Sequence, residues 1–121
     1  MKILVVDDSK AMRMIVKRTL KDAGFGDHPV TEAGNGKEGL AALHAEKFDV
    51  VLCDWNMPEM NGIELLSAVR AEKLAVRFGF VTSESTPAMR EQATEAGAEF
   101  LIGKPFTKEI FFETLSSLLA A

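Results

Sequence analysis

The chain has 121 residues, a formal net charge of −4, 47% hydrophobic residues and 26% charged residues. This composition is typical of a soluble globular domain, and a chain of this length buries about two-thirds of its unfolded surface. The acidic balance disfavours a general binder of nucleic acid or of acidic membranes. A single cysteine excludes an internal disulfide. Neither a signal peptide nor a membrane span is apparent, so we expect a cytoplasmic protein.

Short apolar segments alternate with segments of helical spacing along the whole chain. The expected strands cover residues 2–6, 30–33, 48–53, 76–81 and 99–102. The expected helices cover residues 9–23, 37–46, 62–72 and 87–96, and a last helix follows Thr107 as its cap and ends at residue 119. Gly79 interrupts the fourth strand and indicates a close backbone approach. The alternation predicts one α/β domain with a doubly wound, five-stranded parallel sheet and five helices.

Polar residues stand at the ends of four expected strands. Asp7 and Asp8 follow the first, Asp54 the third, Thr82 the fourth, and Lys104 comes shortly after the fifth. Ligands of open parallel sheets bind beyond the carboxyl ends of the strands. We therefore expect three acids, a hydroxyl and an amine to converge at one edge.

This combination of groups suits phosphoryl transfer. Three carboxylates in one cleft repel one another, and a Mg²⁺ ion would relieve that repulsion. Lys104 suits a phosphate as a compact positive charge, and Thr82 can donate to another phosphate oxygen. Asp54 is then a carboxylate nucleophile of the aspartyl-phosphate type. Positioning and charge neutralisation supply most of the catalysis in such reactions, so no further base is needed.

Each of these residues also has an ordinary structural role. Asp54 can simply open the turn that follows it, and either Asp7 or Asp8 can cap the first helix. Thr82 at a strand end and Lys104 before a proline are each common on their own. Their joint placement at the strand ends favours the chemical interpretation.

Four motifs carry a resemblance to a known family. They are Asp7-Asp8, the stretch Asp54-Trp55-Asn56-Met57-Pro58-Glu59-Met60-Asn61-Gly62, Thr82-Ser83-Glu84, and Lys104-Pro105-Phe106-Thr107. Together they resemble the receiver domains of response regulators, most of all the stand-alone chemotaxis (CheY) type. The resemblance covers essentially the whole chain. It implies a flavodoxin-like fold, with one receiver domain at residues 1–121 and no output domain.

The resemblance also implies roles for the site residues. Asp54 is expected to accept a phosphoryl group from a sensor histidine kinase. Asp8 is expected to bind Mg²⁺ directly, Asp7 less directly, and Asn56 through its backbone carbonyl, with Asp54 completing the metal site. By the same resemblance, Lys104 and Thr82 move to hold the phosphoryl group, so the chain is a signalling receiver that promotes its own phosphorylation and dephosphorylation. The residue types at Asn56 and Glu84 resemble those of chemotaxis proteins whose phosphoryl group is short-lived.

One position departs from the family pattern. The residue three before Lys104 is usually aromatic, whereas here it is Leu101, with Phe100 beside it. Strand alternation puts Phe100 on the other face, so it is not expected to replace the missing ring. We expect an output surface near Met89, Leu101 and Phe112, since Phe112 falls off the apolar stripe of the last helix. We expect a monomer by default, because no output domain is apparent. The resemblance implies as partners a CheA-like kinase, a flagellar motor switch protein or other output protein, and a phosphatase.

Other residues are expected to be structural. We predict that Trp55 is a partly exposed loop residue whose fluorescence responds to Mg²⁺. Cys53 is expected to point into the core. His28 and His44 are expected on the surface, because no third metal ligand accompanies them.

Three other functions compete with a chemotaxis regulator. A regulator of another pathway would act as a phosphorelay shuttle or a phosphate sink. A Mg²⁺-dependent phosphatase with an aspartyl-phosphate would typically place a second acid two residues after the nucleophile, where this chain has Asn56. A flavodoxin-like electron carrier would need hydrogen-bond donors for a phosphate in the loop after the first strand, where this chain has the acidic segment 7–8.

Overall fold

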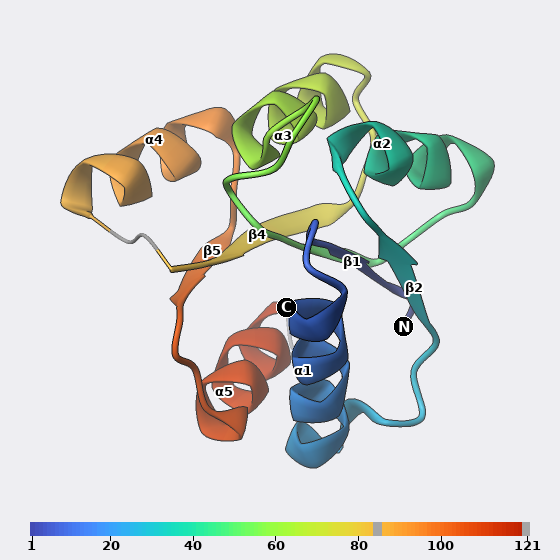
Figure 1. Ribbon diagram of the computed structural model, residues 1–121, viewed down its shortest axis with the longest axis vertical. Coiled ribbons are helices and arrows are strands. Elements are labelled where there is room, and N and C mark those ends of the chain that lie inside the picture. Colours follow the sequence, from blue (N-terminus) through green and yellow to red (C-terminus); the bar gives the residue numbers. More distant parts are fainter. Residues whose placement is uncertain (84–85, 120–121) are drawn as a thin grey trace.

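Five parallel strands form one sheet in the computed structural model, which describes residues 1–83 and 86–119 (Figure 1). The strands, in the spatial order β2-β1-β3-β4-β5, are β1 (Ile3–Val6), β2 (Val30–Ala33), β3 (Val50–Cys53), β4 (Arg77–Thr82) and β5 (Phe100–Gly103). Each expected strand is present, with its ends shifted by at most two residues. The predicted doubly wound parallel sheet is thereby confirmed.

Helices cover both faces of this sheet. They are α1 (Lys10–Leu20), extended by a wider turn η1 (Lys21–Phe25), then α2 (Gly36–Ala45), α3 (Gly62–Ala71), α4 (Pro87–Ala96) and α5 (Lys108–Leu119). Figure 1 shows α2, α3 and α4 on one face and α1 and α5 on the other. No helix among the described residues is long and apolar enough to cross a membrane.

Side-chain caps start the helices where the sequence predicts. The Ser9 hydroxyl accepts from the N–H of Met12 at the start of α1, and Thr107 accepts from the N–H of Ile110 at the start of α5. Asn61 and Glu64 form a reciprocal capping box at the start of α3. This capping box fixes the residue at which the loop after Asp54 ends and α3 begins.

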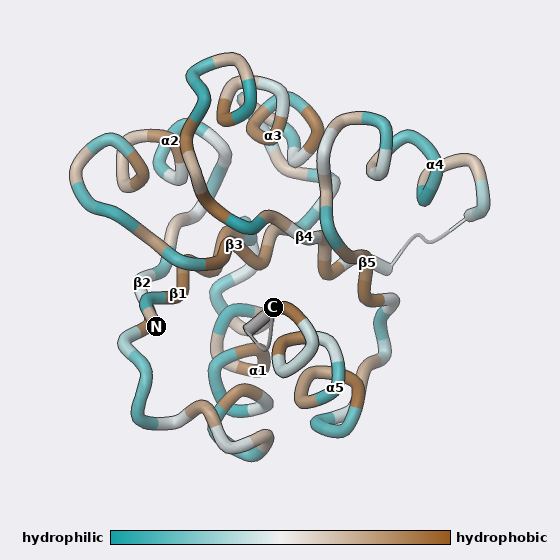
Figure 2. The backbone as a smooth tube through the Cα atoms, turned by 180° about the vertical axis from the view of Figure 1, so that it is seen from behind, coloured by the Kyte–Doolittle hydropathy of each residue, from teal (hydrophilic) through white to brown (hydrophobic). Residues whose placement is uncertain are grey.

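The core lies in two layers, one on each face of the sheet, and the brown strands of Figure 2 run between them. Successive residues of β1 alternate between the layers: Leu4 and Val6 pack under α2–α4, whereas Ile3 and Val5 pack under α1 and α5. All four residues of β1 and of β3 are buried, as expected for strands covered on both faces. The apolar strands therefore hold their polar end residues on a rigid support.

Gly79 is closely approached, but by a side chain and not by backbone as predicted. A side-chain carbon at this position would lie 2.1 Å from the ring of Phe100, its partner on β5. The Phe100 ring thus covers the glycine on the face of α1 and α5, while Leu101 packs with the core of the opposite face. The expectation that Phe100 and Leu101 face opposite ways is confirmed.

Candidate functional site

The register of the sheet brings the predicted polar residues to one edge. Val6 pairs with Cys53, and Thr82 pairs with Gly103. The residues after these pairs therefore emerge side by side: Asp7 and Asp8 after β1, Asp54 after β3, and Lys104 after β5. Thr82 is itself the last residue of β4 and is fully buried.

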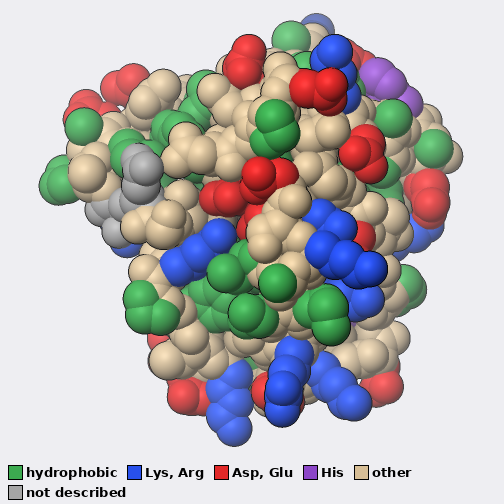
Figure 3. All heavy atoms as spheres, in the orientation of Figure 1, with side chains coloured by type: hydrophobic (Ala, Val, Ile, Leu, Met, Phe, Trp, Pro, Cys, Tyr) green, Lys and Arg blue, Asp and Glu red, His purple; other side chains and the backbone are tan. Residues whose placement is uncertain are grey.

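The three acids form one cluster. Carboxylate oxygens of Asp7, Asp8 and Asp54 all lie within 4.8 Å of one another. The Nζ atom of Lys104 lies 3.4 Å from Oδ2 of Asp7 and 3.8 Å from Oδ1 of Asp54. In the view of Figure 3, acidic side chains gather near the centre of the molecule, with basic side chains to either side. One amine against three carboxylates leaves the cluster with excess negative charge.

Each acid is held differently. Asp7 is only 4% exposed, and its Oδ1 accepts from the N–H of Ser9 at 2.9 Å. The Oδ1 of Asp54 accepts from the N–H of Trp55 at 2.8 Å, and Asp54 is half-buried. Asp8 is exposed and is the acid that solvent reaches most freely. Among the three acids, Asp8 is thus the most accessible to a ligand, Asp54 is intermediate and Asp7 is the least accessible.

Burial raises the pKa of the Asp54 carboxyl above its ordinary value. Lys104 opposes that rise, while the neighbouring charges of Asp7 and Asp8 add to it. A hard divalent cation would favour the ionised form of Asp54, because it binds oxygen ligands and offsets their repulsion. The donor set and the crowded charge both fit such an ion.

Cys53 behaves as predicted. It is fully buried, burial raises the pKa of its thiol well above the ordinary value, and its Sγ donates to the backbone carbonyl of Asp54. A neutral thiol in this position is part of the core.

The prediction that Trp55 is partly exposed is wrong, whereas the response of its fluorescence to Mg²⁺ stays a prediction. This residue is only 9% exposed, and its ring packs on that of Phe80 with a centroid distance of 4.8 Å. The Phe80 ring also packs against the backbone of Gly62. The N–H of Gly62 in turn donates to the Trp55 carbonyl at 2.8 Å. A side-chain carbon on Gly62 would lie 2.4 Å from the backbone oxygen of Asp54. The loop that carries the exposed Asn56 is therefore closed by a glycine and anchored by an aromatic pair.

The expected output residues do not form one patch. Met89 and Leu101 both pack at the margin of the core under α2–α4. Phe112 is 50% exposed as predicted, but its ring lies 6.5 Å from that of Phe25 on η1, on the opposite face of the sheet. The expectation that Phe112 lies near Met89 and Leu101 is thus wrong. Glu84 lies outside the described residues.

Arg13 belongs to the site although its sequence pattern did not single it out. Its Nη1 donates to the backbone oxygen of Asp7 at 2.5 Å, and its Nε donates to Glu32 Oε1 at 2.9 Å. The pattern of a basic residue on an amphipathic helix, six positions after Asp7, indicates only a solvated charge. Only the placement of β2 beside β1 brings Glu32 within its reach.

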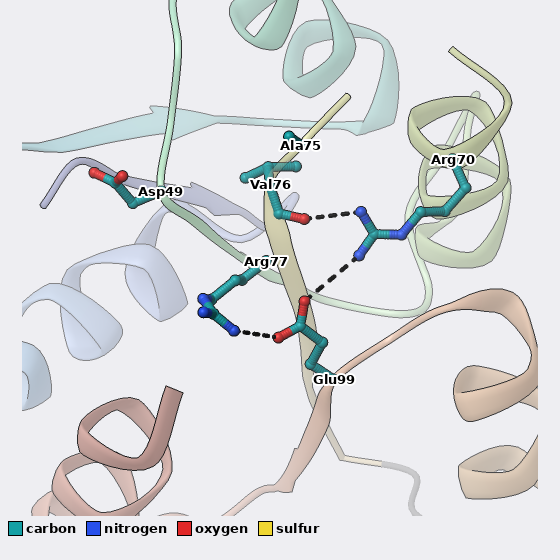
Figure 4. A pocket seen from close by; sticks show the side chains of 6 residues that line it. All are labelled: Asp49, Arg70, Ala75, Val76, Arg77 and Glu99. Atoms are coloured by element: carbon teal, nitrogen blue, oxygen red, sulfur yellow. Dashed lines mark hydrogen bonds and ion pairs between the residues drawn. The ribbon is translucent and has the colours of Figure 1, made fainter. Parts of the chain in front are cut away.

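A second charged hollow lies at the opposite, amino edge of the sheet (Figure 4). Asp49, Arg70, Arg77 and Glu99 line it together with Ala75 and Val76. Arg77 pairs with Glu99 at 3.0 Å, and Arg70 donates to the Val76 carbonyl at 2.8 Å. None of the predicted site residues lies there.

The comparisons with known proteins agree with the geometry. The profile of the response regulator receiver domain matches residues 3–116. A chemotaxis protein CheY of Pseudomonas aeruginosa is 40% identical over 120 residues, which is 98% of this chain and 95% of that protein. Chemotaxis protein CheY1 of Helicobacter pylori is 42% identical, over 98% of this chain and 97% of its own length. The crystal structure of Vibrio cholerae CheY4 superposes with a TM-score of 0.85 at 36% identity, covering 96% of each chain.

Proposed function

Because the chain belongs to the family of response regulator receiver domains, we propose that it accepts a phosphoryl group on Asp54 and changes its partner preference in response. It is a CheY-like response regulator of two-component signalling. The observation that carries the proposal is the half-buried Asp54 carboxylate, crowded by two acids and faced by Lys104 at 3.8 Å. We propose that residues 1–121 act as one receiver unit.

In the phosphorylation step, a carboxylate oxygen of Asp54 attacks the phosphorus of a phosphohistidine on a sensor histidine kinase. A P–O bond forms while the P–N bond breaks, and the imidazole leaves with the electron pair. Lys104 already lies close enough to Asp54 to neutralise charge on the transferred group, and Thr82 supplies a hydroxyl at the same edge.

A Mg²⁺ ion would be held by Asp8 and Asp54, with Asp7 in support and the Asn56 carbonyl as a further ligand. It would supply positive charge to the phosphoryl oxygens. Asp7 and Lys104 form an ion pair beside Asp54, and the phosphoryl group would meet this fixed pattern of charges. Attack by water at phosphorus later breaks the bond to Asp54 and restores the carboxylate.

Transfer also changes the ion pairs at this edge. The Asp54 carboxylate becomes an acyl phosphate, which carries more negative charge and competes with Asp7 for Lys104. Movement of Lys104 would pull on the loop before α5, and Thr82 would pull on β4. Met89 on α4 and Leu101 on β5 pack against the same core layer, and we propose them as the output region. In the proposed coupling from Asp54 to the output region, Leu101 supplies an aliphatic side chain where the family usually has an aromatic ring.

The names of the relatives favour chemotaxis. We propose a CheA-like histidine kinase as the phosphodonor and a flagellar motor switch protein as the output partner, with a phosphatase limiting the lifetime of the phosphorylated state. A shuttle or sink in another phosphorelay would use the same chemistry at Asp54 and would differ only in its partners.

The test is phosphorylation of the purified chain by acetyl phosphate with Mg²⁺, followed by intact-mass spectrometry. We expect a phosphoryl adduct on the wild type and none on Asp54→Asn. Asp49→Asn is the matched control, because this aspartate lies before the same strand at the other edge of the sheet. Equal labelling of the wild type and Asp54→Asn would refute the assignment of the nucleophile.

A further inference from the structure

The exposed carboxylate of Asp8 is positioned through the backbone. Within residues 1–83 and 86–119, no hydrogen bond to this carboxylate is present, in contrast to the bonds that hold Asp7 and Asp54. The peptide that joins Asp7 to Asp8 is planar. Its orientation therefore decides where the Cα of Asp8, and with it the carboxylate, is placed.

Arg13 fixes that peptide. Its Nη1 donates to the carbonyl oxygen of Asp7, which belongs to the peptide in question, at 2.5 Å. The Asp7 N–H on the other side donates to the Ala33 carbonyl at 3.1 Å. The turn is thus held from β2 by a backbone bond and from α1 by a guanidinium. Loss of the guanidinium would free the Asp7 carbonyl to rotate.

The guanidinium is itself held in place. Its Nε donates to Oε1 of Glu32, and Lys17 donates to Oε2 of the same carboxylate at 3.1 Å. Lys17 and Arg13 together lower the pKa of Glu32, so this carboxyl stays ionised. The Arg13 side chain is only 16% exposed. Two donors on one rigid planar group span the gap between Glu32 and Asp7, which a single ammonium cannot do.

We propose that Arg13 is a positioning residue for divalent-cation binding at the acid cluster, acting through the Asp7–Asp8 peptide. The inference rests on the proposed function, since it assumes that the cluster binds Mg²⁺. It extends the site to Arg13 and its anchor Glu32, neither of which touches the ion.

Electrostatics alone predicts the opposite sign. A positive charge beside the cluster repels a cation, so removal of Arg13 would tighten Mg²⁺ binding if only its charge mattered. If the residue acts by holding the Asp7–Asp8 peptide, its removal weakens binding. The direction of the change therefore separates the two explanations.

The experiment measures Mg²⁺ affinity of the unphosphorylated chain by isothermal titration calorimetry. We expect Arg13→Met to raise the dissociation constant about tenfold, as is typical for the loss of a group that orients a metal ligand. Arg13→Lys keeps the charge but not the fork, and is expected to stay weaker than the wild type. Lys17→Met is the matched control: it removes the other cation on Glu32 and should change the affinity by less than about twofold.

Two further measurements separate a loss of Mg²⁺ affinity from a loss of folding or of phosphorylation. Thermal melts without Mg²⁺ check that Arg13→Met and Arg13→Lys are folded. Labelling by acetyl phosphate at saturating Mg²⁺ should be restored in Arg13→Met to near the wild-type rate, with only the half-saturating Mg²⁺ concentration raised. Unchanged or tighter Mg²⁺ binding in Arg13→Met would overturn the inference while leaving the proposed function standing. A wild type that binds no Mg²⁺ would overturn the metal site itself, and the inference with it.

Discussion

The two edges of the sheet carry similar residues in opposite arrangements. At the amino edge, Arg77 and Arg70 both face Glu99, and the closer of these pairs is 3.0 Å apart. At the carboxyl edge, Asp7 and Asp54 share Lys104, the one amine within 4 Å of the three clustered acids among the described residues, and Asp8 has no such partner there. Charges are matched at the first edge and left in excess at the second.

The partners of the two basic residues explain the difference. Arg70 donates to the Val76 carbonyl at 2.8 Å (Figure 4). It also donates to the Gly97 carbonyl at 3.0 Å, so it ties α3 to the start of β4 and to the end of α4. Lys104 spans two carboxylates at 3.4 and 3.8 Å, which are longer and weaker contacts. The contacts at the amino edge favour stability, whereas the carboxyl edge keeps an excess of negative charge, which the proposed cation site would use.

The largest effect is expected from a change at the carboxyl edge. Asp8→Asn removes the exposed acid of the cluster and should weaken Mg²⁺ binding by about 100-fold or more, which is about 2.7 kcal/mol. Titration calorimetry measures the loss. Glu99→Gln, which neutralises an acid at the amino edge, is the control and should leave Mg²⁺ affinity unchanged. Similar losses in both variants would mean that the acids act through net charge rather than as ligands.

The next effect belongs to the amino edge. Arg70→Met leaves the carbonyls of Val76 and Gly97 without their charged donor, and should lower the free energy of unfolding by about 2 kcal/mol. Urea denaturation followed by circular dichroism measures this. Arg77→Met removes an exposed pair with Glu99 and should cost less than about 0.5 kcal/mol. Equal costs for the two variants would contradict the role given to the backbone contacts of Arg70.

The contrast between the edges also marks what the sequence could predict. Asp7, Asp8, Asp54 and Lys104 follow apolar strands and Thr82 ends one, so the parallel direction of the strands alone brings these residues to one edge. Arg70 gave no such signal, because the folding of the chain, and not a local sequence pattern, brings the carbonyls of Val76 and Gly97 to it.

The errors have physical causes of the same kind. Trp55 was predicted to be partly exposed because it begins a polar loop, yet Phe80 from the neighbouring strand offers a ring to cover it. Phe112 was placed with Met89 and Leu101 by helical spacing, which says that it leaves the core stripe but not which neighbour it meets. That neighbour is Phe25, on the wider turn that extends α1. Contacts between elements, unlike the elements themselves, depend on packing that local patterns do not contain.

A smaller effect should come from neutralising the crowded acid. Asp54→Asn is expected to raise the free energy of unfolding by about 1 kcal/mol at neutral pH without metal, because it removes a half-buried charge beside two others. The folded-state pKa of Asp54 is raised, so the stability that its protonated form contributes is lost as pH rises through that pKa.

The difference in free energy of unfolding between the wild type and Asp54→Asn should therefore be largest at neutral pH. It should disappear once the pH falls below the ordinary pKa of an aspartate, 3.8. Thermal melts across this range measure it. Mg²⁺ at neutral pH should narrow the difference, since it stabilises mainly the wild type. A variant that is less stable than the wild type at neutral pH would contradict the repulsion assigned to the cluster.

The smallest effect concerns screening by salt. Repulsion at the carboxyl edge weakens as ionic strength rises, and so do the attractions at the amino edge, because both are partly open to solvent. KCl should therefore stabilise the wild type relative to Asp54→Asn, by about 0.5 kcal/mol between low and physiological ionic strength. The amino-edge pairs are the same in both proteins and cancel in this difference. Paired melts at several KCl concentrations without Mg²⁺ measure it. A difference that does not shrink with salt would mean that Asp54 is destabilised by burial alone, and that the neighbouring acids contribute little to the state from which it reacts.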